Sequence, residues 1–205
     1  MTAQPSARER LLDAADALAF RQGVAATPVD EILREANVAP ATLYAHFGNK
    51  EGLIVSALQR RLARWDEVWQ QDVDDAPTPE GKLLAVLPAI RRFREAASAA
   101  RWCAFLGVAA ESPHPGQPLK DALAGDTQLL TSRLRGLSVP VAGAARADAL
   151  AGQLVLIFTG VLGMILRGMD TDDAVSMGLR TAEAAVEAVR GRRHVTVPSQ
   201  TARGE

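Results

Sequence analysis

One short stretch of the chain combines side chains that can bind phosphates or the edges of DNA bases. Residues 37–50 read NVAPATLYAHFGNK and contain no carboxylate, although acidic residues are frequent elsewhere. Thr42, Tyr44 and His46 fall on exposed faces if this stretch is helical. Their hydroxyl and imidazole groups can donate hydrogen bonds to phosphates and bases. The pattern indicates a nucleic-acid contact surface, but spacing alone is equally compatible with an ordinary helical corner.

Two short helices joined by a tight turn are expected to position this stretch. Thr27, which is followed by a proline and then by two nearby acidic residues, predicts the capped start of the first helix. Asn37 stands where a left-handed residue commonly ends a helix, and a second helix is expected at about 40–46. Leu43 and Phe47 would hold one face of that second helix against the core. This order is helix-turn-helix organisation, in which the second helix can enter the major groove of DNA.

The rest of the chain is predicted to be helical as well. Aromatic residues make up only 4% of the chain, Ala is frequent, and no segment alternates with the period of a strand. Apolar periodicity, capping residues and breaks at Gly and Pro predict an all-α fold of about nine helices. Besides the two short helices described above, further helices are expected at about 7–22, about 50–71, from Thr78 onward with a kink at Pro88, at 102–111, along 119–137, at 142–167 and after Asp170.

Composition excludes several kinds of site. The single cysteine, Cys103, excludes a disulfide framework and a zinc site built on cysteine spacing. The three histidines, His46, His114 and His194, are far apart, so we expect neither a metal site nor a cofactor. The formal net charge of −1 gives no indication of binding to nucleic acid or to a membrane.

One uncharged segment, Ala149–Leu166, approaches the ~20 residues that span a bilayer. It is interrupted by Gln153, Thr159 and glycines, and a helix that is apolar all round can equally lie between two protein chains. We therefore expect a contact between subunits and no membrane span. The first residues lack the basic-then-apolar pattern of a signal peptide, which predicts a cytoplasmic location.

Residues 8–58 resemble the DNA-binding region of the tetracycline-repressor (TetR) family of bacterial transcription regulators. The likeness rests on LLDAADALAFRQGVAATPVDEIL and above all on ANVAPATLYAHFGNKEGL, where several positions agree in order and spacing. Gly23 follows the first helix, and the run from Thr42 to Glu51 matches the family pattern T-L-Y-x-H-F-x-x-K-E. Because these positions are linked, the resemblance is more specific than a single short motif.

The resemblance implies contacts with DNA for individual residues. Phosphates would be contacted by Thr27, Tyr44, His46 and Lys50, and bases would lie nearest to Ala39, Pro40, Ala41 and Thr42. Asn37 replaces the usual Gly of the turn but tolerates the left-handed region, and Ala39 replaces the usual Ser. Because the residues at the start of the second helix are small and apolar, methyl contacts and DNA shape are expected to contribute more to specificity than hydrogen bonds to base edges.

The resemblance also implies two domains and a dimer. We expect a helix-turn-helix domain at 1–50, connected by the helix at about 50–71, then a ligand-binding and dimerisation domain at 51–191 and a disordered tail at 192–205. The apolar residues of the last helix alternate four and three apart, which is typical of a helix–helix seam. The residues expected at the dimer contact are Val155, Phe158, Leu162, Leu179 and Val186.

The larger domain would bind a small effector in an apolar cavity with a few polar anchors. The residues predicted for this cavity are Trp65, Phe93, Trp102, Phe105, Glu111, Gln128 and Met164, with Trp69, Leu106, Phe158, Arg91, Arg94 and Arg167 as further candidates. For any one of these residues, a place in an ordinary packed core is the simpler interpretation.

Other functions remain open on the residues alone. An all-helical carrier of small molecules would explain the larger domain but not the run from Thr42 to Lys50. A cysteine-dependent hydrolase would use Cys103 with His114 and Glu111, yet no loop suited to an oxyanion hole is evident. Cys103 is more simply a small buried hydrophobe than a redox sensor.

Together these features predict a homodimeric DNA-binding regulator that is not an enzyme. Its expected partners are a palindromic double-stranded DNA operator, a second copy of the chain, and a small apolar or amphipathic effector that releases a repressor from DNA.

Overall fold

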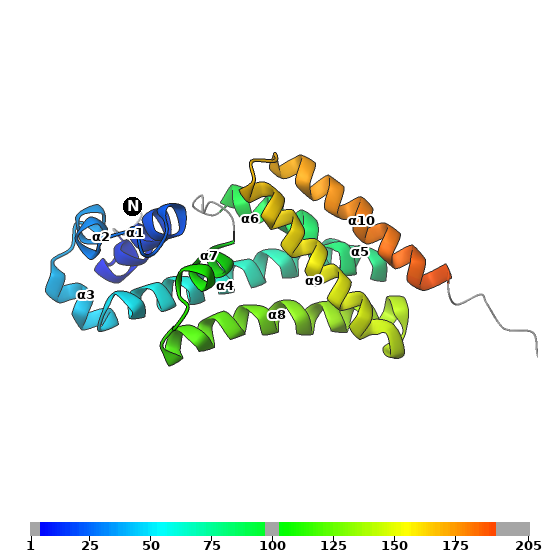
Figure 1. The fold of residues 1–205 in the computed structure, drawn as a ribbon, viewed down its shortest axis with the longest axis horizontal. Coiled ribbons are helices and arrows are strands. Elements are labelled where there is room, and N and C mark those ends of the chain that lie inside the picture. The colour runs from blue at the N-terminus through cyan, green and yellow to red at the C-terminus, as the bar shows by residue number, and fades with distance from the viewer. Residues whose placement is uncertain (1–4, 97–102, 192–205) are drawn as a thin grey trace, which may run out of the picture.

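The computed structural model describes residues 5–96 and 103–191, and every regular element in these two ranges is an α-helix. The described helices are α1 Ala7–Gln22, α2 Val29–Ala36, α3 Pro40–Phe47, α4 Lys50–Asp75, α5 Pro79–Leu84, α6 Val86–Ala96, α7 Ala104–Glu111, α8 Gln117–Ala142, α9 Ala144–Leu166 and α10 Thr171–Gly191. Figure 1 shows α1 to α3 as a head at one end of an elongated molecule, with α4 leading into a body formed by the other helices. The predicted all-α fold is confirmed.

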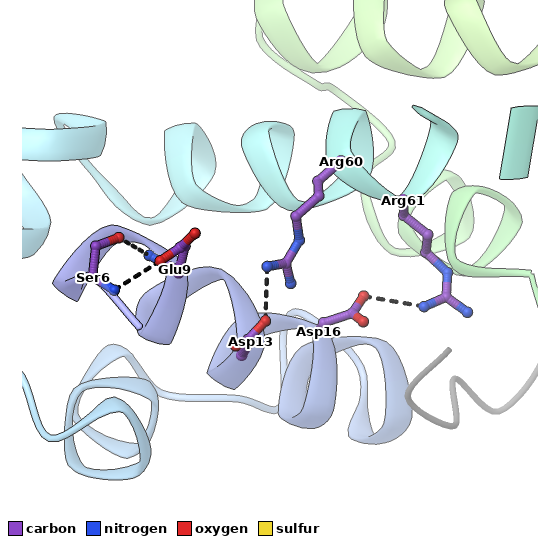
Figure 2. Close-up of polar contacts among 6 residues, drawn as sticks. All are labelled: Ser6, Glu9, Asp13, Asp16, Arg60 and Arg61. Carbon is purple, nitrogen blue, oxygen red and sulfur yellow. Dashed lines mark hydrogen bonds and ion pairs between the residues drawn. The ribbon is translucent and has the colours of Figure 1, made fainter. Parts of the chain in front are cut away.

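The head is built by signals that act within a few residues of chain. At the start of α1, the Ser6 hydroxyl accepts a hydrogen bond from the amide of Glu9 at 3.2 Å (Figure 2), and the Glu9 carboxylate accepts one from the amide of Ser6 at 2.7 Å. α2 ends at Asn37, whose φ of 49° is left-handed as predicted. α3 then begins at Pro40, where proline fits the first turn because it needs no amide partner.

The start of α2 differs from the prediction. Pro28 is the residue that enters this helix with extended backbone angles, and no side chain of the described residues caps it. Thr27 was expected to be the cap, but it is fully buried and its hydroxyl donates a 2.7 Å hydrogen bond to the carbonyl oxygen of Gly23. The predicted cap at Thr27 is therefore wrong, because the hydroxyl closes the preceding loop instead of the helix.

Two ion pairs hold α4 against α1. Arg60 and Arg61 reach from α4 towards Asp13 and Asp16 of α1 (Figure 2), with N···O distances of 2.7 and 3.1 Å respectively. The first pair lies at the surface, whereas the side chains of Arg61 and Asp16 are only 9% and 7% exposed. Breaking a buried pair leaves an uncompensated charge, which costs several kcal/mol. α1 and the middle of α4 are thus coupled at this point.

The helix expected from Thr78 onward is divided into α5 and α6. Thr78 caps α5 as predicted, since its hydroxyl accepts a 3.0 Å hydrogen bond from the amide of Gly81. Pro88 has no amide hydrogen, so the carbonyl of Leu84 lacks the partner that it would have in a continuous helix. The chain turns at Ala85, which separates the two helices. This division accounts for ten described helices where about nine were predicted.

The remaining helices lie where they were predicted, apart from their ends. α4 continues about one turn further than expected, to Asp75. α7 begins at Ala104, with Cys103 as the preceding cap residue. Gly143, with a φ of 79°, separates α8 from α9. Trp102 and the tail at 192–205 lie outside the described residues.

Two hydrophobic clusters stabilise the molecule. One fills the body around the fully buried Trp69 and takes residues from α4, α5, α6, α8, α9 and α10. The other fills the head, but it also includes Phe105 and Val108 of α7 and Leu119 of α8. The predicted boundary at residue 50 therefore divides a core that continues from α1 to the start of α8.

Candidate nucleic-acid interface and ligand cavity

α3 has one face against the head and one in solvent. Leu43 has no exposed surface, and Phe47 is half-buried with the guanidinium of Arg8 5.5 Å from its ring centre. Tyr44 is 56% exposed, and His46 is exposed as well. The structure thus places Tyr44 and His46 on the open side of a helix whose surroundings in sequence carry no carboxylate.

The first turn of α3 is also open to solvent. Ala39, Pro40 and Ala41 are exposed, and Thr42 is half-buried. No side chain of the described residues caps this helix. Pro40 has no amide hydrogen and the amide of Thr42 donates a 3.0 Å hydrogen bond to the carbonyl oxygen of Ala39, so the amide of Ala41 remains available to an oxygen from a partner. Thr27, in contrast, lies in the interior of the head and does not join this surface.

Lys50, at the start of α4, has a partner inside the protein. Its ammonium donates a 2.5 Å hydrogen bond to the carbonyl oxygen of Val24, in the loop between α1 and α2. Burial lowers the pKa of Lys50, and the nearby carboxylate of Glu111 opposes that shift. The side chain therefore anchors the α1–α2 loop, in addition to any contact with a phosphate.

Glu111, the last residue of α7, ties the body to the same loop. Its carboxylate accepts a 2.9 Å hydrogen bond from the amide of Ala25. A Cβ atom at Gly23 would lie 2.7 Å from this carboxylate, so the loop and the end of α7 are in close contact. Glu111 also borders a cavity of about 80 Å³ between α1 and α7. It was predicted to bind the effector, but its hydrogen bond is made to the head.

The body contains a second cavity, of about 70 Å³, between α4, α6, α7, α8 and α9. Trp65 forms the centre of its aromatic wall. The ring of Trp65 lies 5.5 Å from that of Phe93, edge to face, and 5.6 Å from that of Phe158. The wall also includes Arg61 and Arg94. An apolar cavity with a few charged groups is the usual form of a small-molecule site.

The structure places the predicted ligand residues in different settings. Those that line the cavity of the body are Trp65, Phe93, Phe105, Phe158 and Arg94. Gln128 is exposed on α8, and Met164 packs partly buried against the core of the body, so neither is among the lining residues. Trp102 is not among the described residues. The cavity wall therefore includes several of the predicted residues but not Gln128 or Met164, and that an effector binds there stays a prediction.

Two charged residues of the cavity were missed. Arg61 carries its guanidinium 5.0 Å from the ring centre of Phe93, and Asp126 of α8 has its pKa raised to about 6 by burial. The sequence does contain a signal for Asp126, because it stands in the apolar stripe of α8 between Leu123 and Leu130. A charge at such a position is costly unless it has a function or a partner.

Cys103 is unsuited to nucleophilic or redox chemistry. Burial raises the pKa of its thiol to about 11, so it remains protonated at neutral pH. Glu111 lies at the opposite end of α7, roughly 12 Å away by the helical rise, and His114 is exposed in the following loop. The three residues of the alternative hydrolase site are therefore not brought together as that alternative requires.

α9 presents an outward face of small and apolar residues. Leu156 is 74% exposed, and nothing lies within 4 Å of the Cβ position at Gly152, Gly160 or Gly163. By length and composition, α9 is the one described helix that could cross a membrane, with a mean hydropathy of 2.2 in a window that is 33% buried. Its inner face packs between α8 and α10.

The residues predicted at the dimer contact lie mainly inside one protomer. Val186 and Leu162 are 0% and 7% exposed, and Phe158 belongs to the cavity wall. Val155 and Leu179 are half-buried. Leu162 and Val186 thus pack within the chain, whereas a dimer contact at Val155 and Leu179 stays a prediction. Apolar spacing alone does not distinguish an internal face from an external one. The exposed large apolar residues on α9 and α10 are Leu156, Leu166 and Met177.

Known proteins share both the head and the whole fold. The family profile described as "Bacterial regulatory proteins, tetR family" matches residues 11–57, which comprise most of α1, all of α2 and α3 and the start of α4. A TetR-family transcriptional regulator from Streptomyces coelicolor has a similar structure, with a TM-score of 0.80 and 27% identity over 89% of this chain and 95% of that one. The chain belongs to the tetR family of bacterial regulatory proteins.

Curated HTH-type transcriptional regulators resemble part of the chain. The HTH-type transcriptional regulator BetI of Rhizobium meliloti (strain 1021) is 31% identical over 111 residues, 53% of this chain and 55% of BetI. The HTH-type transcriptional repressor KstR of Mycobacterium tuberculosis (strain ATCC 25618 / H37Rv) is 34% identical over 90 residues, 44% of this chain and 41% of KstR. This chain therefore spans about half the length of these curated relatives, or less. Membership of the tetR family rests on the head and on the overall fold.

Proposed function

We propose that this tetR-family protein is a transcriptional regulator whose heads bind a palindromic DNA operator. The observation that carries the proposal is the exposure of Tyr44 and His46 on α3, the second helix of the helix-turn-helix. In this proposal α3 enters the major groove of DNA, and the side chains of Tyr44 and His46 bind phosphates that border the groove. The bases then lie nearest to the exposed start of α3, at Ala39, Pro40 and Ala41 with Thr42.

The composition of this surface determines how DNA sequence is read. Alanine and proline offer methyl and methylene groups, which can contact the methyl group of thymine but cannot read base edges by hydrogen bonds. Specificity is then expected from thymine contacts and from sequence-dependent DNA shape. The symmetry of a dimer increases the affinity for DNA, because two linked heads on adjacent half-sites bind more tightly than either head alone.

The second copy of the chain is proposed to bind the outward face of α9 and α10. An exposed leucine such as Leu156 loses unfavourable contact with water when another protein covers it, and the glycines beside it allow two helices to approach closely. Gln153 and Thr159 are also exposed on α9. Polar side chains are accommodated in a protein contact more readily than in lipid, which favours a dimer over a membrane span.

Two connections link the cavity of the body with the heads. α7 begins at the cavity wall with Phe105 and ends with Glu111 bonded to the α1–α2 loop. α4 carries Arg61, which lines the cavity and pairs with Asp16 of α1. A molecule that enlarges the cavity would move either connection and change the spacing of the heads. We propose that it releases a repressor from its operator.

Selection from random DNA tests the proposed function directly. The full-length protein is incubated with a random double-stranded library, and bound DNA is amplified and sequenced over several rounds. We expect a palindrome whose half-sites lie about one helical turn apart, roughly 34–36 Å. The double variant Tyr44→Ala, His46→Ala should fold as before and lose the enrichment. Failure of the wild-type protein to enrich any sequence would favour a carrier without DNA binding.

An operator as partner also implies a cytoplasmic location, where bacterial DNA is found.

A further inference from the structure

The cavity of the body contains a guanidinium group that has no direct partner among the described residues. Arg61 and Arg94 both line the cavity. Arg61 is paired with Asp16 at 3.1 Å. Arg94 makes no hydrogen bond or ion pair with any residue in the described parts of the chain. Burial lowers the pKa of Arg94, and repulsion from Arg61 lowers it further, so the two guanidinium groups lie close enough to oppose each other.

Asp126 is not a direct partner of Arg94. It is the single carboxylate among the described lining residues, and burial raises its pKa to about 6. A carboxylate paired with an arginine would have its pKa lowered by that attraction, but here burial is the only cause of the shift. No ion pair or hydrogen bond joins Asp126 to Arg94 among the described residues. Arg94 keeps its charge at neutral pH, because guanidinium does not lose its proton in proteins.

The uncharged part of the cavity is suited to a flat apolar group. Trp65 lies between Phe93 and Phe158, with ring centres 5.5 and 5.6 Å away. Aromatic walls of this kind bind a ring by stacking or by edge-to-face contact. The cavity thus combines one available guanidinium with an aromatic surface.

We propose that the effector is a small organic anion with an aromatic or apolar body; this proposal rests on the function proposed above. Its carboxylate or sulfonate binds the guanidinium of Arg94, and its body packs against Trp65 and Phe158. Arginine suits this role because its planar N–H groups can form two parallel hydrogen bonds with such an anion. Arg94 is then the residue that distinguishes an anion from a neutral molecule of the same shape.

The same contact explains how an anion would affect DNA binding. A cavity of about 70 Å³ is smaller than the ~300–1,000 Å³ of common ligand sites, so the effector must enlarge it. An anion on Arg94 also lies near Arg61 and competes with Asp16 for that guanidinium. Loss of the Arg61–Asp16 pair releases α1 from α4 at a buried contact. The anion and the operator therefore oppose each other's binding.

A matched pair of fluorescent probes tests this proposal on the full-length protein without DNA. One probe is 8-anilinonaphthalene-1-sulfonate, and the other is N-phenyl-1-naphthylamine, which has the same aromatic body without the sulfonate. We expect Arg94→Gln to weaken binding of the sulfonate probe by about tenfold or more and to change binding of the neutral probe less than about twofold. Arg94→Lys, which keeps a positive charge, should retain part of the preference. Arg167→Gln removes the same charge from an exposed position after α9 and should leave both affinities unchanged.

The outcomes separate this proposal from the regulatory function. Equal weakening of both probes by Arg94→Gln would show that Arg94 only shapes the cavity, and unchanged binding of the sulfonate probe would place the anion elsewhere. Either result overturns the proposal. Operator binding is measured separately, by titration of the selected palindrome with and without the sulfonate probe. If no palindrome is found but the probe preference depends on Arg94, the regulatory function fails and the anion site stands.

Discussion

The carboxylate of Glu111 accepts a 2.9 Å hydrogen bond from the backbone amide of Ala25, which joins the last residue of α7 to the loop before α2. This contact bridges 86 positions of sequence and connects the body with the DNA-binding head. Because the opposite end of α7 borders the cavity of the body, a shift of this short helix reaches both places.

Glu111→Ala tests whether this bond closes the α1–α2 loop. In the wild-type protein this amide can exchange its hydrogen only after its bond to Glu111 has opened. Without that acceptor, the amide of Ala25 is expected to exchange about tenfold faster or more. Hydrogen exchange followed by NMR measures this at the single amide. Glu67→Ala, on the exposed face of α4, is the matched control and should leave the rate unchanged. An unchanged rate in Glu111→Ala would show that the bond does not protect the loop.

Lys50→Met separates an anchor within the head from a phosphate contact. The hydrogen bond to Val24 predicts a loss of about 1 kcal/mol in the free energy of unfolding, with the salt dependence of DNA binding nearly unchanged. The resemblance alone predicts that the slope of log affinity against log salt flattens by about 2 per dimer, since each neutralised phosphate contributes about −0.9. Binding isotherms at several salt concentrations distinguish these two expectations. A flattened slope with unchanged stability would restore the phosphate contact as the role of Lys50.

Tyr44→Phe removes one hydroxyl from the exposed face of α3. Since the side chain is 56% exposed, the free energy of unfolding should stay within about 0.5 kcal/mol of wild type. Operator binding should weaken by about 1 kcal/mol per half-site, because a hydrogen bond to phosphate is lost. Denaturant unfolding and operator titration measure the two effects. Equal operator affinity of the two proteins would remove Tyr44 from the proposed contact.

Leu156→Asp is expected to dissociate the dimer without unfolding the protomer. At 74% exposure, the new carboxylate faces water in the monomer, but a dimer contact would bury it at a cost of several kcal/mol. Sedimentation velocity at micromolar concentration, together with circular dichroism, should show a folded monomer. Leu156→Ala, which stays apolar, should remain dimeric. A wild-type protein that sediments as a monomer would contradict the proposed interface, as would a dimer that tolerates the aspartate.

Asp126 should make stability fall with rising pH. Its pKa of about 6 in the folded protein lies above the ordinary 3.8, so between these values the folded protein holds a proton that the unfolded chain releases. The free energy of unfolding therefore decreases as pH rises through this window, by up to about 2 kcal/mol. Asp126→Asn should lose this decrease, as measured by urea unfolding from about pH 4 to about pH 7. Asp121→Asn, an exposed acid on the same helix, should keep the wild-type profile. Parallel profiles for wild type and Asp126→Asn would refute the raised pKa.

The sequence by itself determined the helices of the head and the family to which it belongs. The capping box from Ser6 to Glu9, the left-handed turn at Asn37 and the start of α3 at Pro40 are local devices, each acting over a few residues. The spacing of Leu43 likewise predicted its buried side correctly. Such features can be read along the chain because helix geometry fixes the neighbours of each residue within one or two turns.

Only the tertiary structure decided which distant residues meet. The pairs Arg61–Asp16 and Glu111–Ala25 lie 45 and 86 positions apart, and no spacing along one helix predicts them. The packing of α9 between α8 and α10 also decided that Leu156 faces outward while Phe158 lines the cavity. Helical periodicity assigns residues to a common face, but the partner of each face depends on how the helices cross in space. The charged residues that line the cavity and the outward apolar face of α9 were therefore decided by packing.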